Sequence, residues 1–297
     1  MIATIPEPVV INRLIRWAER REDIRAMLLY SSRTNPTAQV DIFSDYDILL
    51  AVTDIHKFYN DDRWLEDFGK VLVVFRNPIG IEQGFECFGF VTHYQDGTKI
   101  DYGFYPVEFF HWVARQPELP EDFDYGYRVL LDKDRLTEKI HPPAYRAYLP
   151  KPPTEKEYRA IVEEFFNDAL YVGKHLWRGN LFAVKLSLDY IMKYTDVRKM
   201  LEWRMEIDQN WSLRTKGAGR EIKQHTDPGL WTELGETYVG AGMEENWEAL
   251  FKTIQLFRKV ANEVAGSLGF TYPADLDRQV IVALEGVRGL KNDYDSL

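Results

Sequence analysis

Three aspartates lie in or beside apolar segments, where a carboxylate is unexpected. Asp45 and Asp47, separated by one residue, begin the apolar run 46–52, and Asp101 lies within the apolar and aromatic segment 98–106. In a strand, residues i and i+2 project to the same face, so Asp45 and Asp47 should point together. Paired carboxylates repel each other and lose hydration unless a cation lies between them. Mg²⁺ prefers oxygen ligands and bridges to phosphates, and Asp101 would complete its ligand set.

Ser31-Ser32-Arg33 follows the apolar segment 24–30. Backbone N–H groups and hydroxyls at such a turn can hold phosphate oxygens, and Arg33 could add charge-assisted contacts to a triphosphate. Each feature alone also fits an ordinary turn or a solvated strand end. The order is a strand, Ser-Ser, twelve residues, Asp-x-Asp, a second strand and a later Asp. This combination favours a nucleotide and metal site.

A mixture of strand and helix patterns surrounds these residues. Apolar spacing predicts a helix in 8–23, and short helices are predicted at 61–68, ending at Gly69, and at 106–116. Strands are predicted at 24–30, 46–52, 70–75, 86–94 and 98–106, with a hairpin turn at 95–97. The carboxylates therefore belong to a mixed β-sheet flanked by helices.

The composition changes at residues 141–153, which contain five prolines. Such a segment cannot form a helix interior or a central strand, so it is predicted to be a stiff linker. Thr154 and Glu157 then match a capping box, and helical patterns follow at 155–178, 181–194, 196–207 and 246–269. The predicted fold class is α+β, with a sheet-containing domain at 1–140 and an all-α helical bundle at 154–297.

Composition excludes several classes of protein. A net charge of −10 argues against sequence-independent nucleic-acid binding and is compatible with a cationic substrate. The single cysteine, Cys87, excludes an internal disulfide and a cysteine-rich zinc site. We find no secretory leader and no apolar run of the ~20 residues that span a bilayer. We therefore expect a cytoplasmic protein that binds no membrane and no nucleic acid, and that is a monomer or weak homodimer.

The chain resembles the aminoglycoside 6-adenylyltransferase (streptomycin adenylyltransferase) family of the DNA polymerase β-like nucleotidyltransferase superfamily. The superfamily signature is Gly-Ser, a gap of about a dozen residues, Asp-x-Asp/Glu and a later acid. The matching stretches run in order through nearly the whole chain. They are SRTNP, DYDILLAVTD, DDRWLEDFG, DGTKIDYGFYPVE, LLDKD, YVGKHLWR and ENWEALFKTIQLFRKVANEVAGSLGFTYP. The resemblance implies a nucleotidyltransferase domain at 1–140 and a substrate-binding domain at 154–297.

The resemblance also implies a reaction, the transfer of AMP from ATP to a hydroxyl of an aminoglycoside. Streptomycin is the expected acceptor, pyrophosphate is released, and the modification would confer antibiotic resistance. Asp45, Asp47 and Asp101 carry over as ligands of two Mg²⁺ ions, which would activate the attacking oxygen and neutralise the leaving group. Ser32 carries over as the serine of the nucleotide loop. The family glycine before it is Ser31 in this chain, although glycine lets a phosphate approach the backbone closely.

A general base would help a sugar hydroxyl to react. Asp101 could be this base, and so could a carboxylate of the helical domain, for which Asp189 is the candidate. Asp189 could equally form a surface ion pair with Lys185 or Lys193, each four residues away.

The predicted substrate-binding residues lie in the helical domain. Glu163, Glu164 and Asp189 could bind the guanidinium or ammonium groups of the substrate, and Trp177 could stack on a cationic sugar. The alternatives are a solvated helix face for the glutamates and core packing for Trp177.

Two other functions stay open. The same AMP transfer could have another small hydroxylated molecule or a protein side chain as its acceptor, since one sequence does not reveal acceptor specificity. The chain could also be a non-catalytic nucleotide-binding protein, which only Ser31 suggests. The three acids argue against that function, because clustered carboxylates are costly to keep without a metal.

Overall fold

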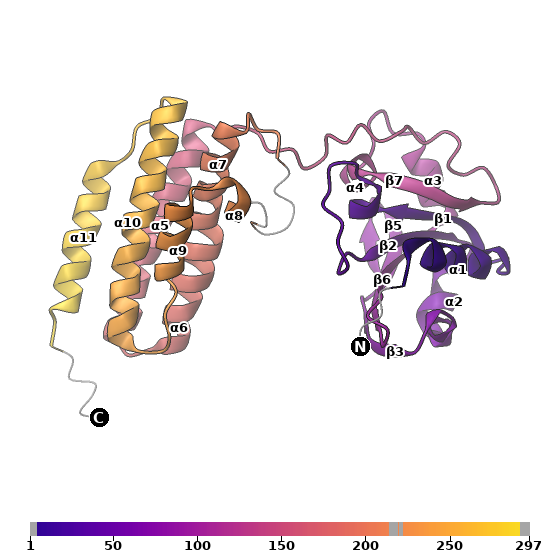
Figure 1. Ribbon diagram of the computed structural model, residues 1–297, viewed down its shortest axis with the longest axis horizontal. Helices are drawn as coiled ribbons and strands as arrows, with labels where there is room; N and C mark the ends of the chain where they lie inside the picture. Colours follow the sequence, from indigo (N-terminus) through magenta and orange to yellow (C-terminus); the bar gives the residue numbers. More distant parts are fainter. Residues whose placement is uncertain (1–4, 214–218, 220–221, 292–297) are drawn as a thin grey trace. The chain divides into compact units, whose positions relative to one another are not determined.

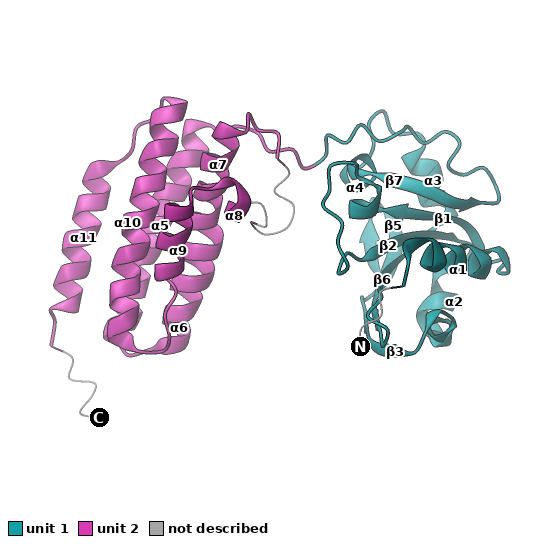
Figure 2. Ribbon diagram, in the orientation of Figure 1, with its two compact units in different colours: residues 1–147 teal, residues 148–297 magenta. Residues whose placement is uncertain are grey.

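The computed structural model describes residues 5–213, 219 and 222–291. The chain forms two compact units, residues 1–147 and 148–297 (Figures 1 and 2). The division falls inside the proline-rich segment, which has no regular secondary structure. The start of this segment is held to unit 1 because Asp124 accepts hydrogen bonds from the backbone N–H groups of Ala144, Arg146 and Ala147 at 2.7–2.9 Å.

Unit 1 contains the predicted mixed sheet. The strands are β1 (Ile24–Tyr30), β2 (Tyr46–Val52), β3 (Val71–Arg76), β4 (Gly80–Glu82), β5 (Phe85–Tyr94), β6 (Lys99–Pro106) and β7 (Tyr127–Asp132). Their order is β3-β5-β6-β2-β1-β7, and β4 pairs with β5. The central pair β2–β6 is parallel, whereas the neighbouring pairs β1–β2 and β5–β6 are antiparallel.

Helices cover both faces of the sheet. One core lies beneath α1 (Glu7–Glu19), α2 (Ile55–Asn60) and the 3₁₀ helix η2 (Arg63–Phe68), and it takes up Ile48 and Leu50 of β2. The other core lies beneath α3 (Val107–Val113) and α4 (Glu121–Tyr125), and it takes up Leu49 and Ala51. Because side chains alternate along a strand, Asp47 has the same orientation as Leu49 and therefore lies on the α3 face.

Most of the predicted elements are present, with corrected limits. Helix α1 ends at Glu19, and the predicted helix at 61–68 is the 3₁₀ helix η2, which ends before Gly69. Gly69 has φ 149°, a conformation that favours glycine. Strands β4 and β7 and helices α2 and α4 were not predicted. In β7 every residue is exposed or half-buried, so its sequence lacks the alternation that marks a strand.

Unit 2 is a helical bundle. Its helices are α5 (Glu155–Trp177), α6 (Leu181–Lys185), the π-helix η3 (Leu186–Val197), α7 (Arg198–Asp208), α8 (Ile222–His225), α9 (Pro228–Glu236), α10 (Met243–Leu268) and α11 (Ala274–Arg288). The predicted capping box is present, because Thr154 and Glu157 cap the start of α5 reciprocally. Phe165 and Phe257 stack in the core with ring centroids 3.7 Å apart. None of the helices in the described part of the chain is both long and apolar enough to cross a membrane.

Candidate active site

The sheet brings the three predicted aspartates to one place. Asp47 of β2 pairs in register with Asp101 of β6 in the parallel ladder. Residues paired in register on adjacent strands project their side chains to the same face of the sheet. Asp45 lies two residues before Asp47, immediately before β2 begins. The i, i+2 spacing and the register of two strands therefore form a cluster of carboxylates on the α3 face.

A lysine that the sequence analysis did not select joins two of these acids. Lys99 Nζ lies 2.5 Å from Asp45 Oδ2 and 2.9 Å from Asp101 Oδ2. Burial opposes the charge of this ammonium, but the hydrogen bonds and charges of Asp45 and Asp101 raise its pKa. Lys99 is therefore a cation at neutral pH. The signal in the sequence was its position two residues before Asp101, which places both side chains on one face of β6.

The two acids of the register pair differ from ordinary aspartates. Burial, followed by repulsion from Asp101 and Asp45, raises the pKa of Asp47 to about 6, although a hydrogen bond from the Ser31 side chain opposes the shift. Burial also raises the pKa of Asp101, against the effect of Lys99. Asp101 Oδ1 is buried and has no hydrogen-bond partner in the structure as described. The cluster therefore has more negative charge than its surroundings neutralise.

Ser31 and Ser32 begin the 3₁₀ helix η1 (Ser31–Thr34), directly after β1. Ser31 has φ 68°, in the left-handed region that glycine adopts readily and other residues rarely adopt. Its backbone N–H donates to Gly126 O at 3.0 Å, and its carbonyl accepts a 2.8 Å hydrogen bond from Thr34 Oγ1. This conformation gives a physical reason for a glycine at this position in related chains.

Arg33 binds protein atoms in this structure. Its guanidinium donates to Asp45 O at 2.8 Å, to Ser44 O at 2.7 Å and to Glu7 Oε2 at 3.0 Å. It also lies 3.9 Å from the ring centroid of Tyr46, and its side chain is 9% exposed. These contacts fix the backbone at the start of β2. A contact between Arg33 and a triphosphate stays a prediction.

A cavity of about 350 Å³ adjoins the register pair. Its lining includes Tyr30, Asp47, Glu82, Asp101 and Tyr105. Tyr105 donates a 2.5 Å hydrogen bond to Glu82, and burial raises the pKa of Tyr30, with a further contribution from the charge of Asp47. The tyrosine hydroxyls are therefore protonated at neutral pH. The cavity has an acidic lining suited to a cation or to metal-bound phosphates.

The carboxylates fit a hard divalent cation by their donor chemistry, and the unpartnered oxygen of Asp101 is a free ligand atom. As the side chains stand, no three His, Cys, Asp or Glu residues of the described ranges are placed to share one metal ion. In this cluster the Lys99 ammonium lies between Asp45 and Asp101, where a shared metal ion would have to bind. The oxygen donors suit a metal ion, but the side chains would have to converge, with that ammonium displaced, to share one.

The predicted residues of unit 2 lie on the helices α5 and η3. Asp189 binds Lys185 Nζ at 3.2 Å and Lys193 Nζ at 2.7 Å. Both of the ion pairs that the sequence offered as an alternative to a catalytic role are therefore present. Glu163 accepts a 2.8 Å hydrogen bond from Arg159 on the exposed face of α5. Both carboxylates are thus engaged with cations of their own helices, and their catalytic or substrate-binding roles stay predictions.

Glu164 and Trp177 also lie on α5, where Glu164 is exposed and Trp177 is half-buried. Near Glu164 lies an acid that the sequence analysis missed. Asp196 of η3 is 1% exposed, and its Oδ2 has no hydrogen-bond partner among the residues described. Burial, with repulsion from Glu164 and Asp168, raises the pKa of Asp196 to about 8. Its only signal in the sequence was a charged residue within a helical, partly apolar segment.

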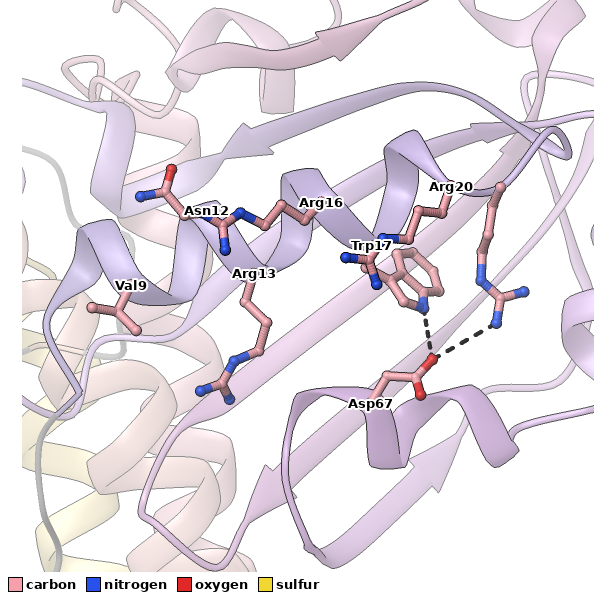
Figure 3. A pocket seen from close by; sticks show the side chains of 8 residues that line it. Val9, Asn12, Arg13, Arg16, Trp17, Arg20 and Asp67 are labelled. Atoms are coloured by element: carbon pink, nitrogen blue, oxygen red, sulfur yellow. Dashed lines mark hydrogen bonds and ion pairs between the residues drawn. The ribbon is translucent and has the colours of Figure 1, made fainter.

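A cavity of about 640 Å³ runs along α1, on the opposite side of the sheet from Asp47 (Figure 3). Its lining residues are Val9, Asn12, Arg13, Arg16, Trp17, Arg20, Arg21 and Asp67. Asp67 accepts a hydrogen bond from Trp17 Nε1 at 3.0 Å and lies 3.8 Å from Arg21. Figure 3 marks the contact between Trp17 and Asp67. This basic cavity includes none of the predicted site residues.

Comparison with known proteins identifies the family. The family model described as streptomycin adenylyltransferase matches residues 6–287. The chain belongs to the streptomycin adenylyltransferase family. The relatives include the aminoglycoside 6-adenylyltransferase of Bacillus subtilis (strain 168), 30% identical over 95% of this chain and 97% of that protein. Those of Campylobacter jejuni (30% identical, 90% of this chain, 91% of that protein) and Staphylococcus aureus (23%, 90% and 93%) are also similar.

This membership confirms the resemblance inferred from the motifs. The streptomycin adenylyltransferase family consists of aminoglycoside nucleotidyltransferases, so the protein is an enzyme of that class. The match covers both units, from the start of α1 almost to the end of α11. The mixed sheet followed by a helical bundle agrees with the fold expected from the sequence.

Proposed function

We propose that this protein transfers AMP from ATP to a hydroxyl group of an aminoglycoside, with streptomycin as the preferred acceptor, and releases pyrophosphate. The observation that carries the proposal is the cluster of Asp45, Asp47 and Asp101 beside the turn at Ser31–Arg33. Three relatives that cover nine-tenths or more of the chain are named aminoglycoside 6-adenylyltransferases, which supports the same reaction.

Asp45, Asp47 and Asp101 would hold the Mg²⁺ ions, of which we propose two. When bound, the metal would supply Lewis-acid stabilisation of the charge that develops on the reacting phosphate. The backbone and hydroxyl groups of Ser32 would bind triphosphate oxygens at the same end of the sheet. Ser31, whose N–H donates to Gly126 O and whose hydroxyl binds Asp47, would shape this turn. Arg33 would act through its observed contacts, which hold Ser44 and Asp45 against that turn.

Of the two candidate bases, the geometry favours Asp101. Its Oδ1 atom has no hydrogen-bond partner in the described structure, so this oxygen could accept the proton of the acceptor hydroxyl while Oδ2, which now binds Lys99, serves the metal. Burial raises the pKa of Asp101 and brings it closer to neutrality, as a general base requires. By contrast, both carboxylate oxygens of Asp189 are engaged by lysines. We therefore assign the base to Asp101 and a structural ion pair to Asp189.

The acceptor is expected to be cationic. Aminoglycosides carry ammonium or guanidinium groups, which the acidic chain as a whole attracts. In unit 2 we assign the first contact with these groups to Glu164, because Glu163 already binds Arg159. Trp177, at the end of the same helix, would supply an aromatic surface for a sugar ring. We further propose that the enzyme works in the cytoplasm as a monomer or weak homodimer, without binding nucleic acid, and confers resistance to its substrate.

Mass spectrometry of the drug tests the proposal directly. The purified protein is incubated with ATP, Mg²⁺ and streptomycin, and in parallel with kanamycin and spectinomycin, while released pyrophosphate is measured. We expect streptomycin to gain the mass of one AMP in step with pyrophosphate release, and Asp47→Asn protein of unchanged circular dichroism to give neither. AMP on a protein but on no drug would indicate a protein acceptor, and ATP binding without pyrophosphate release would indicate a non-catalytic protein.

A further inference from the structure

The position of Lys99 follows from the geometry of the sheet. The parallel ladder between β2 and β6 begins with the pair Tyr46 and Ile100, so Asp45 and Lys99 lie one step before it. Lys99 and Asp101 are two residues apart on β6 and share a face. The ammonium therefore reaches both carboxylates, with Nζ–Oδ2 distances of 2.5 and 2.9 Å.

The contacts of Lys99 are more protected than those of an ordinary surface ion pair. Its side chain is 23% exposed, and those of Asp45 and Asp101 are 34% and 26% exposed. An ammonium that bridges two partly buried carboxylates is screened less by water than an exposed pair, so its contacts are stronger.

The charges in the cluster do not balance. Asp45, Asp47 and Asp101 carry three negative charges when ionised, and Lys99 supplies one positive charge, which leaves two negative charges. The ammonium also leaves Asp101 Oδ1 without a partner within the described structure. A divalent cation in place of the ammonium would lower this excess from two negative charges to one.

We propose that Lys99 is a positioning residue that occupies the cation position between Asp45 and Asp101, and that a divalent cation displaces its ammonium when it binds. The inference rests on the metal site of the proposed function. Before the metal binds, Lys99 holds Asp45 and Asp101 together against their mutual repulsion. When the metal binds, the lysine side chain swings away, because its four-carbon chain is flexible. An arginine would move less readily, because its guanidinium group is larger and planar.

This role has an unusual consequence. Removing a residue that only stabilises the fold weakens metal binding, because the ligands become disordered. Removing a competing cation strengthens metal binding and at the same time destabilises the metal-free protein. Lys99→Met keeps much of the side-chain volume without the charge, so it separates these two roles. The matched control is Lys57→Met, because Lys57 binds Asp23 Oδ2 at 2.6 Å in the same unit, away from the cluster.

Calorimetric titration with MgCl₂ alone, without ATP, measures the metal affinity of each protein, and thermal unfolding in EDTA and in MgCl₂ measures its stability. We expect Lys99→Met to bind Mg²⁺ about tenfold more tightly than wild type, since the metal no longer competes with an ion pair. Its Tm should fall in EDTA and recover in MgCl₂. Lys99→Arg should keep the wild-type Tm in EDTA and bind Mg²⁺ no more tightly than wild type, and Lys57→Met should bind Mg²⁺ like wild type.

Equal or weaker Mg²⁺ binding by Lys99→Met, with an intact circular dichroism spectrum, would overturn the inference. If Lys99→Met does not fold, Lys99→Gln takes its place with the same expectations. The proposed function is tested separately, because AMP transfer by the wild type is measured on the drug. A wild-type protein that transfers AMP while Lys99→Met binds Mg²⁺ like wild type would refute only the role of Lys99. A wild-type protein that neither binds Mg²⁺ nor transfers AMP would refute both.

Discussion

Asp47 and Asp101 lie opposite each other on adjacent parallel strands, so two carboxylates leave the same face of the sheet side by side. Asp47 responds with a pKa of about 6, because it is buried and repelled by Asp101 and Asp45. A fold that keeps such a pair gives up stability in its metal-free form. Removing one charge of the pair should therefore change both the stability of unit 1 and its activity.

Asp47→Asn should abolish AMP transfer without weakening the fold. We expect a loss of about 10³-fold or more in kcat/KM, since a charge that holds a catalytic metal contributes several kcal/mol to the barrier. The Tm in EDTA should rise or stay constant, because one of the repelling charges is gone. Initial rates and thermal unfolding check both parts. Substantial activity in a folded, metal-saturated Asp47→Asn protein would remove Asp47 from the mechanism.

Ser31→Gly and Ser31→Ala separate the two properties of Ser31. Both variants lose the hydroxyl that hydrogen-bonds to Asp47, but only glycine adopts φ 68° without strain. Urea unfolding should therefore find Ser31→Gly more stable than Ser31→Ala by about 1 kcal/mol. Calorimetry with MgATP should find tighter binding to Ser31→Gly than to Ser31→Ala, because the phosphate approaches the backbone more closely. Equal free energies of unfolding for the two variants would mean that the left-handed φ of residue 31 does not destabilise the protein.

Glu164→Gln should weaken binding of the aminoglycoside, whereas Glu163→Gln is the matched control on the same helix. The carboxylate of Glu163 already serves Arg159, so a substrate gains little from it. We expect Glu164→Gln to raise the KM for streptomycin about three- to tenfold with kcat unchanged, as for one partly solvated ion pair. The KM for ATP should not change. An equal rise of KM in both variants would point to the overall charge of α5 instead of Glu164.

Asp196→Asn should change how stability depends on pH. The pKa of Asp196 is about 8 in the folded protein, against about 3.9 in an unfolded chain. Between these values the folded state keeps a proton that the unfolded state releases, so the free energy of unfolding falls as pH rises. Asparagine resembles the protonated acid, and we expect Asp196→Asn to exceed the wild type by about 1–3 kcal/mol at about pH 8 and to match it near pH 4.

Urea unfolding of both proteins across this pH range checks the Asp196 prediction. Parallel stability profiles for Asp196→Asn and wild type would show that Asp196 ionises normally in the folded protein. Asp168→Asn should change the pH profile less than Asp196→Asn does, because Asp168 is only half-buried and contributes to the raised pKa of Asp196 through repulsion.

The sequence predicts the strands that carry the serine turn and the acids, because β1, β2 and β6 are apolar and bounded by turns. It does not predict that β2 and β6 are neighbours, since register between distant strands leaves no local pattern. Lys99 was missed for this reason: its contact with Asp45 exists only in that register. The edge strand β7 was missed because half-exposed residues do not alternate.

Asp196 was missed for a different reason. It lies in the π-helix η3, where hydrogen bonds join residues five apart and each turn contains more residues than in an α-helix. A projection at 3.6 residues per turn therefore assigns the later side chains of this segment to the wrong face. The same helix places Asp189 between two lysines, and the spacing of four residues was sufficient to foresee that contact.

Two of the three hydrogen bonds of Arg33 join the two ends of the loop formed by residues 34–43. They hold residues 44 and 45 directly to residue 33. The position of the acids therefore does not depend on the conformation of the intervening backbone. This loop is exposed where it returns to Ser44, since Ile42 and Phe43 are 66% and 74% accessible. Insertions in this loop should therefore be tolerated, and it is a practical attachment point for a fluorescent label beside the turn at Ser31–Arg33.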